Sequence, residues 1–178
     1  MFESRGPDLT AIRFSPEGAV TDPIETMIAA RTLTTDDEHE SFNKAFNRLP
    51  QVLDRSSALR LVDVFDDATG DPQWMYEVIH RIEHLPIPEL EDALVSALPR
   101  LRERAPEWAE ALVMRSLNIP TARLELLARA ERGSTLEKVA LTTILEAISV
   151  YPEAVGSHAR EVGDKLQGPF GPGRPIAE

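Results

Sequence analysis

The sequence predicts an all-α protein, an irregular HEAT-like array of stacked antiparallel helices that follows a short extended N-terminal arm. Two observations predict this fold class. Apolar residues recur at intervals of three and four along most of the chain, the spacing that places them on one face of an α-helix. Prolines and capping residues divide this pattern into segments joined by short turns, as in stacked helical hairpins. The sequence shows no exact repeat unit, so we expect an irregular array.

The chain divides into three parts. Residues 1–20 have weak periodicity and are expected to form the extended arm. Residues 21–167 carry the helical pattern and form the predicted helical domain. Residues 168–178 are rich in glycine and proline, so this tail is expected to be neither regular helix nor central strand. A length of 178 residues with 42% hydrophobic residues is enough for one domain with a sizeable core.

Two helices are predicted in the first third of the chain. The first spans about residues 22–33, where an aspartate followed by a proline marks its start. The second spans about residues 35–49. Thr35 with Glu38 three residues later is the signature of a capping box, and Pro50 ends this helix.

Two helices are predicted in the middle of the chain before residue 86. A short one covers residues 56–65. A longer one covers residues 71–85, with Asp71 as its cap and Pro72 at its first position. Trp74 begins the apolar face of this second helix.

The remaining helices are less uniform. Leucines at helical spacing over residues 90–101 predict a helix that Pro99 should kink or break. Ser134 and Glu137 form a second capping-box signature. Helices are predicted at 106–118, 120–133, 134–151 and 152–166.

The charge of the chain is unevenly distributed. The formal net charge is −11, and residues 1–100 contain 19 acidic and 9 basic residues, so this half accounts for −10. Such a surface would repel nucleic acid, which is bound through lysine and arginine. It would attract and steer a basic protein partner. The alternative interpretation is that the excess charge only keeps the protein soluble.

Composition excludes several classes of function. The chain contains no cysteine, which excludes disulfides, thiolate zinc sites and cysteine nucleophiles. No apolar run reaches the length of about 18 residues that suggests a transmembrane helix, and the first residues lack the apolar core of a signal peptide. We therefore expect a cytoplasmic protein that does not contact membranes.

An acidic loop next to an aromatic residue is the main candidate site. Its aspartates could cap helices and carry solvated charge, bind a protein partner together with nearby aromatic residues, or hold a divalent cation. The chain lacks the ligand spacing of an EF-hand. The residues expected to contact a partner are Asp66, Asp67, Asp71, Trp74, Glu77 and Glu83.

A second candidate is the string at residues 80–84, which matches the H-x-x-E-H pattern of inverted zinc peptidases. On a helix, His80 and His84 would share one face and could bind zinc, while Glu83 would hold a water molecule. The alternative is that both histidines are structural. We expect the alternative, and no metal or other cofactor, because no further ligand is singled out by the sequence.

Two expectations concern packing. Trp108 sits early in its predicted helix, and a tryptophan in that place is typical of the core. Arg100, Arg102 and Arg104 could pair with the acidic first half of the chain or with the carbonyl groups that end their own helix.

The middle of the chain resembles the immunity protein 30 family of bacterial polymorphic-toxin systems. The resembling segments are residues 65–67, 74–75, 79–83, 105–109 and 115–118. The similar region covers about residues 40–150. The resemblance implies a mostly helical protein that binds and neutralises a cognate toxin, with no catalysis and no cofactor. Many toxins of this kind attack nucleic acid, so a basic toxin is the expected partner.

Two other functions remain as alternatives. The chain could be a helical-repeat scaffold or adaptor for another protein, since such arrays offer extended binding surfaces. It could also be a zinc hydrolase that uses the string at residues 80–84.

Overall fold

The computed structural model describes residues 21–167, and this part of the chain contains nine α-helices, one short 3₁₀ helix and no strand. The predicted all-α class is therefore confirmed. The predicted arm and the Gly/Pro-rich tail lie outside the described residues. The elements are α1 (Pro23–Ala29), α2 (Asp36–Phe46), α3 (Arg55–Leu61), η1 (Val62–Val64), α4 (Pro72–Ile82), α5 (Ile87–Arg104), α6 (Pro106–Asn118), α7 (Pro120–Glu131), α8 (Thr135–Ile148) and α9 (Ala154–Gln167).

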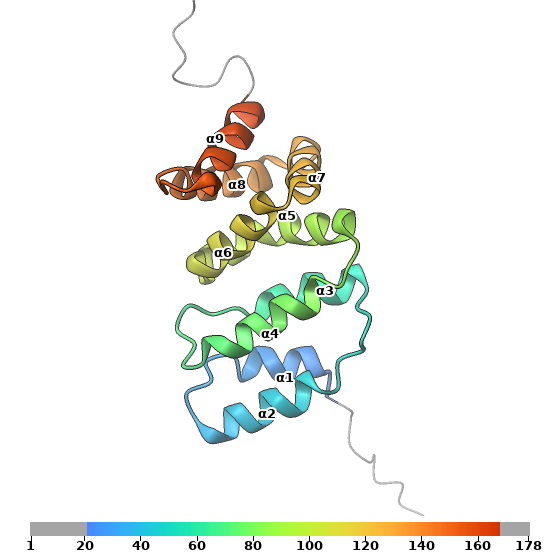
Figure 1. The fold of residues 1–178 in the computed structure, drawn as a ribbon. Coiled ribbons are helices and arrows are strands. Elements are labelled where there is room, and N and C mark those ends of the chain that lie inside the picture. Colours follow the sequence, from blue (N-terminus) through green and yellow to red (C-terminus); the bar gives the residue numbers. More distant parts are fainter. Residues whose placement is uncertain (1–20, 168–178) are drawn as a thin grey trace, which may run out of the picture.

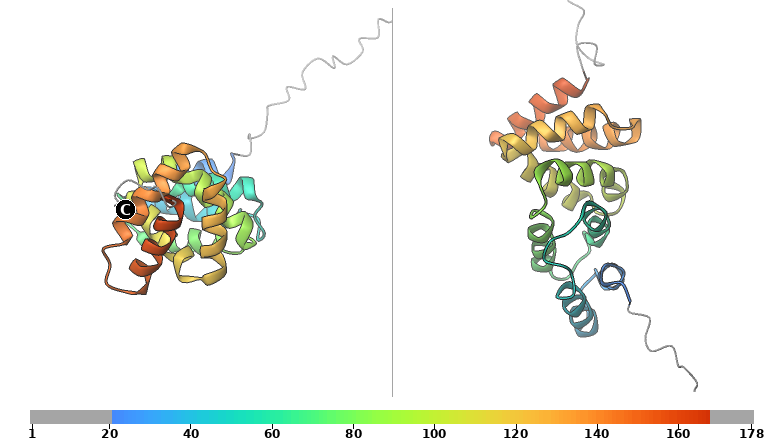
Figure 2. Two further views of the ribbon diagram at one scale, coloured as in Figure 1. Left: turned by 90° about the horizontal axis from the view of Figure 1, so that it is seen from above. Right: turned by 90° about the vertical axis from the view of Figure 1, so that its right-hand side faces the viewer.

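The helices form an elongated stack in the order of the chain (Figure 1). Helices α1 and α2 lie at one end, followed by α3 and α4, then by α5 and α6, and finally by α7, α8 and α9 at the other end. Two further views show the same order (Figure 2). Helix α5 packs against α3, α6, α7 and α8, so it is the central element of the stack. The specific likeness to HEAT repeats stays a prediction.

Local sequence explains where several helices begin. The Asp22 side chain accepts a hydrogen bond from the backbone N–H of Ile24 at the start of α1. Both predicted capping boxes form, one at Thr35 for α2 and one at Ser134 for α8. In each box the side chains satisfy backbone N–H groups that a helix start leaves without intrahelical partners. The predicted starts of these helices are therefore confirmed to within a residue.

Helix α5 departs from the prediction, because it begins earlier, at Ile87, and continues through Pro99 to Arg104 without a break. Contacts with the preceding layer hold its second half in place. The Arg100 guanidinium donates hydrogen bonds to the Asp63 carboxylate at 2.7 Å and to the Leu59 carbonyl at 2.7 Å. Of the two pairings left open for this arginine, the structure shows the one with the acidic first half of the chain.

A continuous apolar core runs through the stack. Trp108 is 8% exposed and belongs to this core, as predicted. Its ring packs against Phe65 and Tyr76, with centroids 5.5 and 5.3 Å apart, and its indole N–H donates to the Asp66 carbonyl at 3.2 Å. The ring therefore joins α6 to the loop before α4 and to α4 itself.

None of the helices within residues 21–167 combines the length and the apolar character needed to cross a membrane.

Candidate functional site

The acidic loop at residues 65–71 is fixed by hydrogen bonds within the chain. One oxygen of the Asp66 carboxylate accepts from the Arg31 Nε at 2.9 Å, and the other accepts from the backbone N–H of Ala68 at 2.9 Å. The Asp66 side chain is only 14% exposed. Its carboxylate is therefore mainly an internal ion-pair partner that ties the loop to the end of α1.

Asp67 caps a helix that begins 39 residues later in the chain. Its carboxylate accepts from the backbone N–H of Glu107 at 3.0 Å and of Trp108 at 3.3 Å. Helix α6 has no local side-chain cap, because Ala105 at that position offers no acceptor. Asp67 therefore supplies the cap from another layer of the stack, and its negative charge suits the positive end of the helix dipole.

Asp71 caps α4, as predicted, and also approaches α2. Its Oδ1 accepts from the backbone N–H of Gln73 at 3.1 Å. Its Oδ2 lies 3.7 Å from the Nδ1 of His39 on α2, and about a third of the side chain is exposed. The capping interpretation therefore holds for both Asp67 and Asp71.

Trp74 joins α4 to α2. Its half-buried ring contacts Phe42 and Phe46, with centroids 5.5 and 5.6 Å away. These contacts join the middle and the end of α2 to the first turn of α4, and the approach of His39 to Asp71 places the end of the first turn of α2 beside the start of α4. Acidic residues lie near the starts of both helices.

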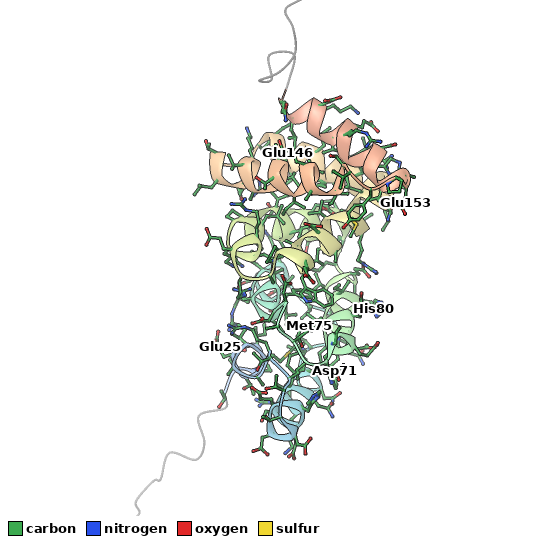
Figure 3. All side chains as sticks on the ribbon, turned by 90° about the vertical axis from the view of Figure 1, so that its left-hand side faces the viewer. Glu25, Asp71, Met75, His80, Glu146 and Glu153 are labelled. Atoms are coloured by element: carbon green, nitrogen blue, oxygen red, sulfur yellow. The ribbon has the colours of Figure 1, made fainter. Side chains whose placement is uncertain are left out.

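We call a set of carboxylates near the starts of α2 and α4 the α2–α4 acidic face. Its members are Asp36, Asp37, Glu40, Asp71 and Glu77. Asp36 and Asp37 are exposed, and neither forms an ion pair with another described residue. Glu77 lies one turn beyond Trp74, and among the described residues only Gln73 donates a hydrogen bond to it, at 3.3 Å. Figure 3 shows Asp71 at the end of α4 nearer α2, and His80 farther along the same helix.

The first turn of α2 was not among the residues singled out from the sequence. Its signal was nonetheless present as a run of acidic residues directly after the cap at Thr35. Such a run is expected at any helix start, since it complements the helix dipole. The sequence could not show that this turn lies beside Asp71.

Glu83 forms a bidentate ion pair with Arg115. The two bonds join Nε to Oε1 at 2.5 Å and Nη2 to Oε2 at 2.7 Å. The side chains are 30% and 40% exposed. The pair links the end of α4 to α6, so Glu83 has a cationic partner within the chain.

The zinc string does not have the helical geometry expected from its sequence. Helix α4 ends at Ile82, so Glu83 is its cap and His84 lies in the following turn. His80 and His84 therefore do not occupy successive turns of one helix face, and Glu83 is held by Arg115. Within residues 21–167 there is no group of three or more histidine, aspartate or glutamate side chains placed to hold a metal ion.

Comparison with known proteins gives one match. No curated protein and no solved structure matches the chain. The model of the family described as Immunity protein 30 matches residues 29–126, just over half of the chain. The matched segment contains α2, α4, the acidic loop and the Glu83–Arg115 pair. This chain belongs to the Immunity protein 30 family.

Proposed function

We propose that this protein binds a cognate toxin and neutralises it by occupying or distorting the toxin's active site, without catalysing a reaction. Family membership is the observation that carries the proposal, because an immunity protein protects against a toxin. The cytoplasmic location expected from the sequence is part of the same proposal. A helical scaffold for an unrelated partner is the alternative.

The α2–α4 acidic face is the proposed contact surface. Its exposed carboxylates lie within the segment that matches the family model. A group of carboxylates attracts a basic partner and accelerates its association. A toxin with a basic cleft for nucleic acid would be attracted in this way.

The residues singled out from the sequence take two proposed roles. Asp71 and Glu77 offer partly exposed carboxylates for direct contact, and Trp74 on the same helix is half-buried. The carboxylates of Asp66 and Asp67 accept hydrogen bonds within the chain, so these residues hold the loop in shape. Glu83 stays a candidate contact through the exposed part of its pair with Arg115.

A co-expression experiment tests the proposal. The toxin encoded beside this protein is induced in cells with and without the protein, and survival is measured together with recovery of a complex from the lysate. Survival with recovery of a one-to-one complex is the expected result. A complex that forms without protection would favour the scaffold function, and protection without a complex would contradict neutralisation by binding.

A further inference from the structure

A cavity of about 350 Å³ lies between α4, α5, α6 and the start of α7. Its volume falls at the lower end of the range of small-ligand pockets, about 300–1,000 Å³. Most of its walls are apolar, including Ile79 and Ile82 from α4, Leu94 from α5 and Leu112 from α6. A ligand with an aliphatic body would therefore fit these walls.

Glu91 is the unusual residue in the wall of this cavity. It is 0% exposed, and its Oε1 accepts a hydrogen bond from the Ser116 hydroxyl at 2.8 Å. Its Oε2 has no hydrogen-bond partner in the described part of the chain. Burial raises the pKa of this carboxyl to about 7, and the nearby charge of Glu125 adds to the effect. A buried carboxylate oxygen without a partner is costly, so the site favours a ligand that supplies one.

The other charged groups that line the cavity satisfy each other. Glu83 and Arg115 form the bidentate pair described above, so the Arg115 guanidinium is already committed to a carboxylate. Glu91 is therefore the acidic group of the cavity that lacks a cationic partner. The Oε1 of Glu91 is occupied by Ser116, which leaves one oxygen for a ligand.

We propose that this cavity binds an aliphatic cation, with a primary ammonium group at the Oε2 of Glu91 and the aliphatic chain against Ile79, Ile82 and Leu112. An ammonium is a compact charge that suits a single carboxylate oxygen, whereas a guanidinium is best matched by both oxygens. A free alkylamine and a lysine side chain of a bound protein share this chemistry. The cavity lies apart from the residues of the α2–α4 acidic face but shares Glu83 with the candidate toxin contacts, so only the lysine source of the cation rests on the proposed function.

The test compares hexylammonium with 1-hexanol and methylammonium by calorimetric titration of the full chain at pH 8. The dissociation constant of hexylammonium should be about 10- to 100-fold lower than that of hexanol, because its bond to the carboxylate is charge-assisted. Methylammonium should bind weakly, since it lacks the chain. Glu91→Gln should remove the preference for hexylammonium over hexanol. Glu89→Gln, which removes an exposed charge from the same helix, should keep it.

A second measurement uses the unaltered protein, so it holds even if Glu91→Gln fails to fold. Nuclear Overhauser contacts between the hexyl chain and the methyl groups of Ile79, Ile82 and Leu112 should locate the ligand in the cavity. Equal binding of hexanol and hexylammonium, equal binding to both glutamine variants, or contacts elsewhere would each overturn the proposal. Loss of hexylammonium binding in the toxin complex would assign the cation to a toxin lysine, and retained binding would assign it to a free amine. Because the titration uses the free protein, its result does not depend on whether the protein binds a toxin.

Discussion

The Asp67 carboxylate accepts a hydrogen bond from the backbone N–H of Trp108 at 3.3 Å, and so connects the acidic loop to the first turn of α6. A second bond from the backbone N–H of Glu107 completes the cap. The Trp108 indole N–H also donates to the carbonyl of Asp66, so both the backbone and a side chain of α6 donate hydrogen bonds to the loop.

The first prediction concerns this cap. Asp67→Ala should lower the free energy of unfolding by about 0.5–2 kcal/mol, because the first N–H groups of α6 lose their acceptor. Asp67→Asn should cost much less, since asparagine also caps helices well. Urea denaturation followed by circular dichroism measures both. Equal stability of the alanine variant and the parent protein would show that the cap contributes nothing.

The second prediction concerns the Trp108 ring. Trp108→Ala should lower the free energy of unfolding by about 3–5 kcal/mol, because it leaves a large cavity between Phe65 and Tyr76. Trp108→Phe should cost less, because phenylalanine keeps most of the buried volume, although it loses the indole hydrogen bond. The same denaturation experiment applies. A stable alanine variant that no longer bound the toxin would place Trp108 in the interface instead.

The third prediction concerns pH and Glu91. Below its ordinary pKa of 4.5 the carboxyl is protonated in the folded and unfolded states alike. Between pH 4.5 and about 7 the unfolded chain loses this proton while the folded protein keeps it, so the free energy of unfolding falls as pH rises. The total loss is about 3 kcal/mol. Above pH 7 this contribution stays lost.

Glu91→Gln should therefore stabilise the protein at pH 8 and have little effect at pH 4. Denaturation curves across this pH range measure the difference between the variant and the parent protein. Glu89→Gln is the matched control, because its side chain is exposed on the same helix. A stability difference for Glu91→Gln that does not change with pH would contradict a raised pKa.

The fourth prediction concerns an ion-pair network between layers. Arg129 on α7 binds Asp92 on α5 and Glu137 on α8, the latter at 2.8 Å, and its side chain is only 16% exposed. Burial raises the pKa of Asp92, but hydrogen bonds from Arg129 and Arg55 outweigh it and hold this pKa below its usual value. Stability from this carboxylate is therefore present at neutral pH and lost as pH falls below about 4.

Arg129→Gln should lower the free energy of unfolding at pH 7 by about 1–3 kcal/mol, because Glu137 loses its cationic partner and Asp92 keeps only Arg55. Lys44→Gln is the control. It breaks an exposed pair with Glu40, whose loss should cost at most about 0.5 kcal/mol. Equal effects of the two substitutions on urea denaturation at pH 7 would show that the network adds no more than a surface pair.

The sequence predicted the helices best where local signals decide them. The capping boxes at Thr35 and Ser134 use side chains only three residues apart, so their spacing can be recognised directly. The prediction at Pro99 was wrong because it also used only a local signal. Its local effect disfavours a helix, but tertiary contacts of Arg100 with the preceding layer favour continuation.

The contacts of the candidate site were less predictable, because they join distant parts of the chain. Asp67 and its helix are separated by about 40 residues, and Asp66 binds Arg31 from 35 residues away. Nothing in the local pattern indicates such pairs. The burial of Glu91 could not be predicted either. A glutamate that follows a leucine along a helix is usually expected to face solvent.

Recruitment of the toxin by the α2–α4 acidic face can be tested with variants in which carboxylates of this face are replaced by neutral amides. Asp36→Asn, Asp37→Asn and Glu77→Gln together remove three charges from this face and keep side-chain shape. The matched control is Glu131→Gln, Glu146→Gln and Glu153→Gln, which removes three exposed charges from the last layers. Figure 3 shows Glu146 and Glu153 at the opposite end of the stack from Asp71.

The most direct measurement is the association rate constant of each protein with the cognate toxin at low and at physiological salt. The parent and the control variant should associate quickly at low salt and lose much of that rate at physiological salt, where screening limits the field to about 8 Å. The acidic-face variant should associate more slowly at low salt and respond less to salt. Equal rates and equal salt dependence for the two triple variants would contradict recruitment by this face.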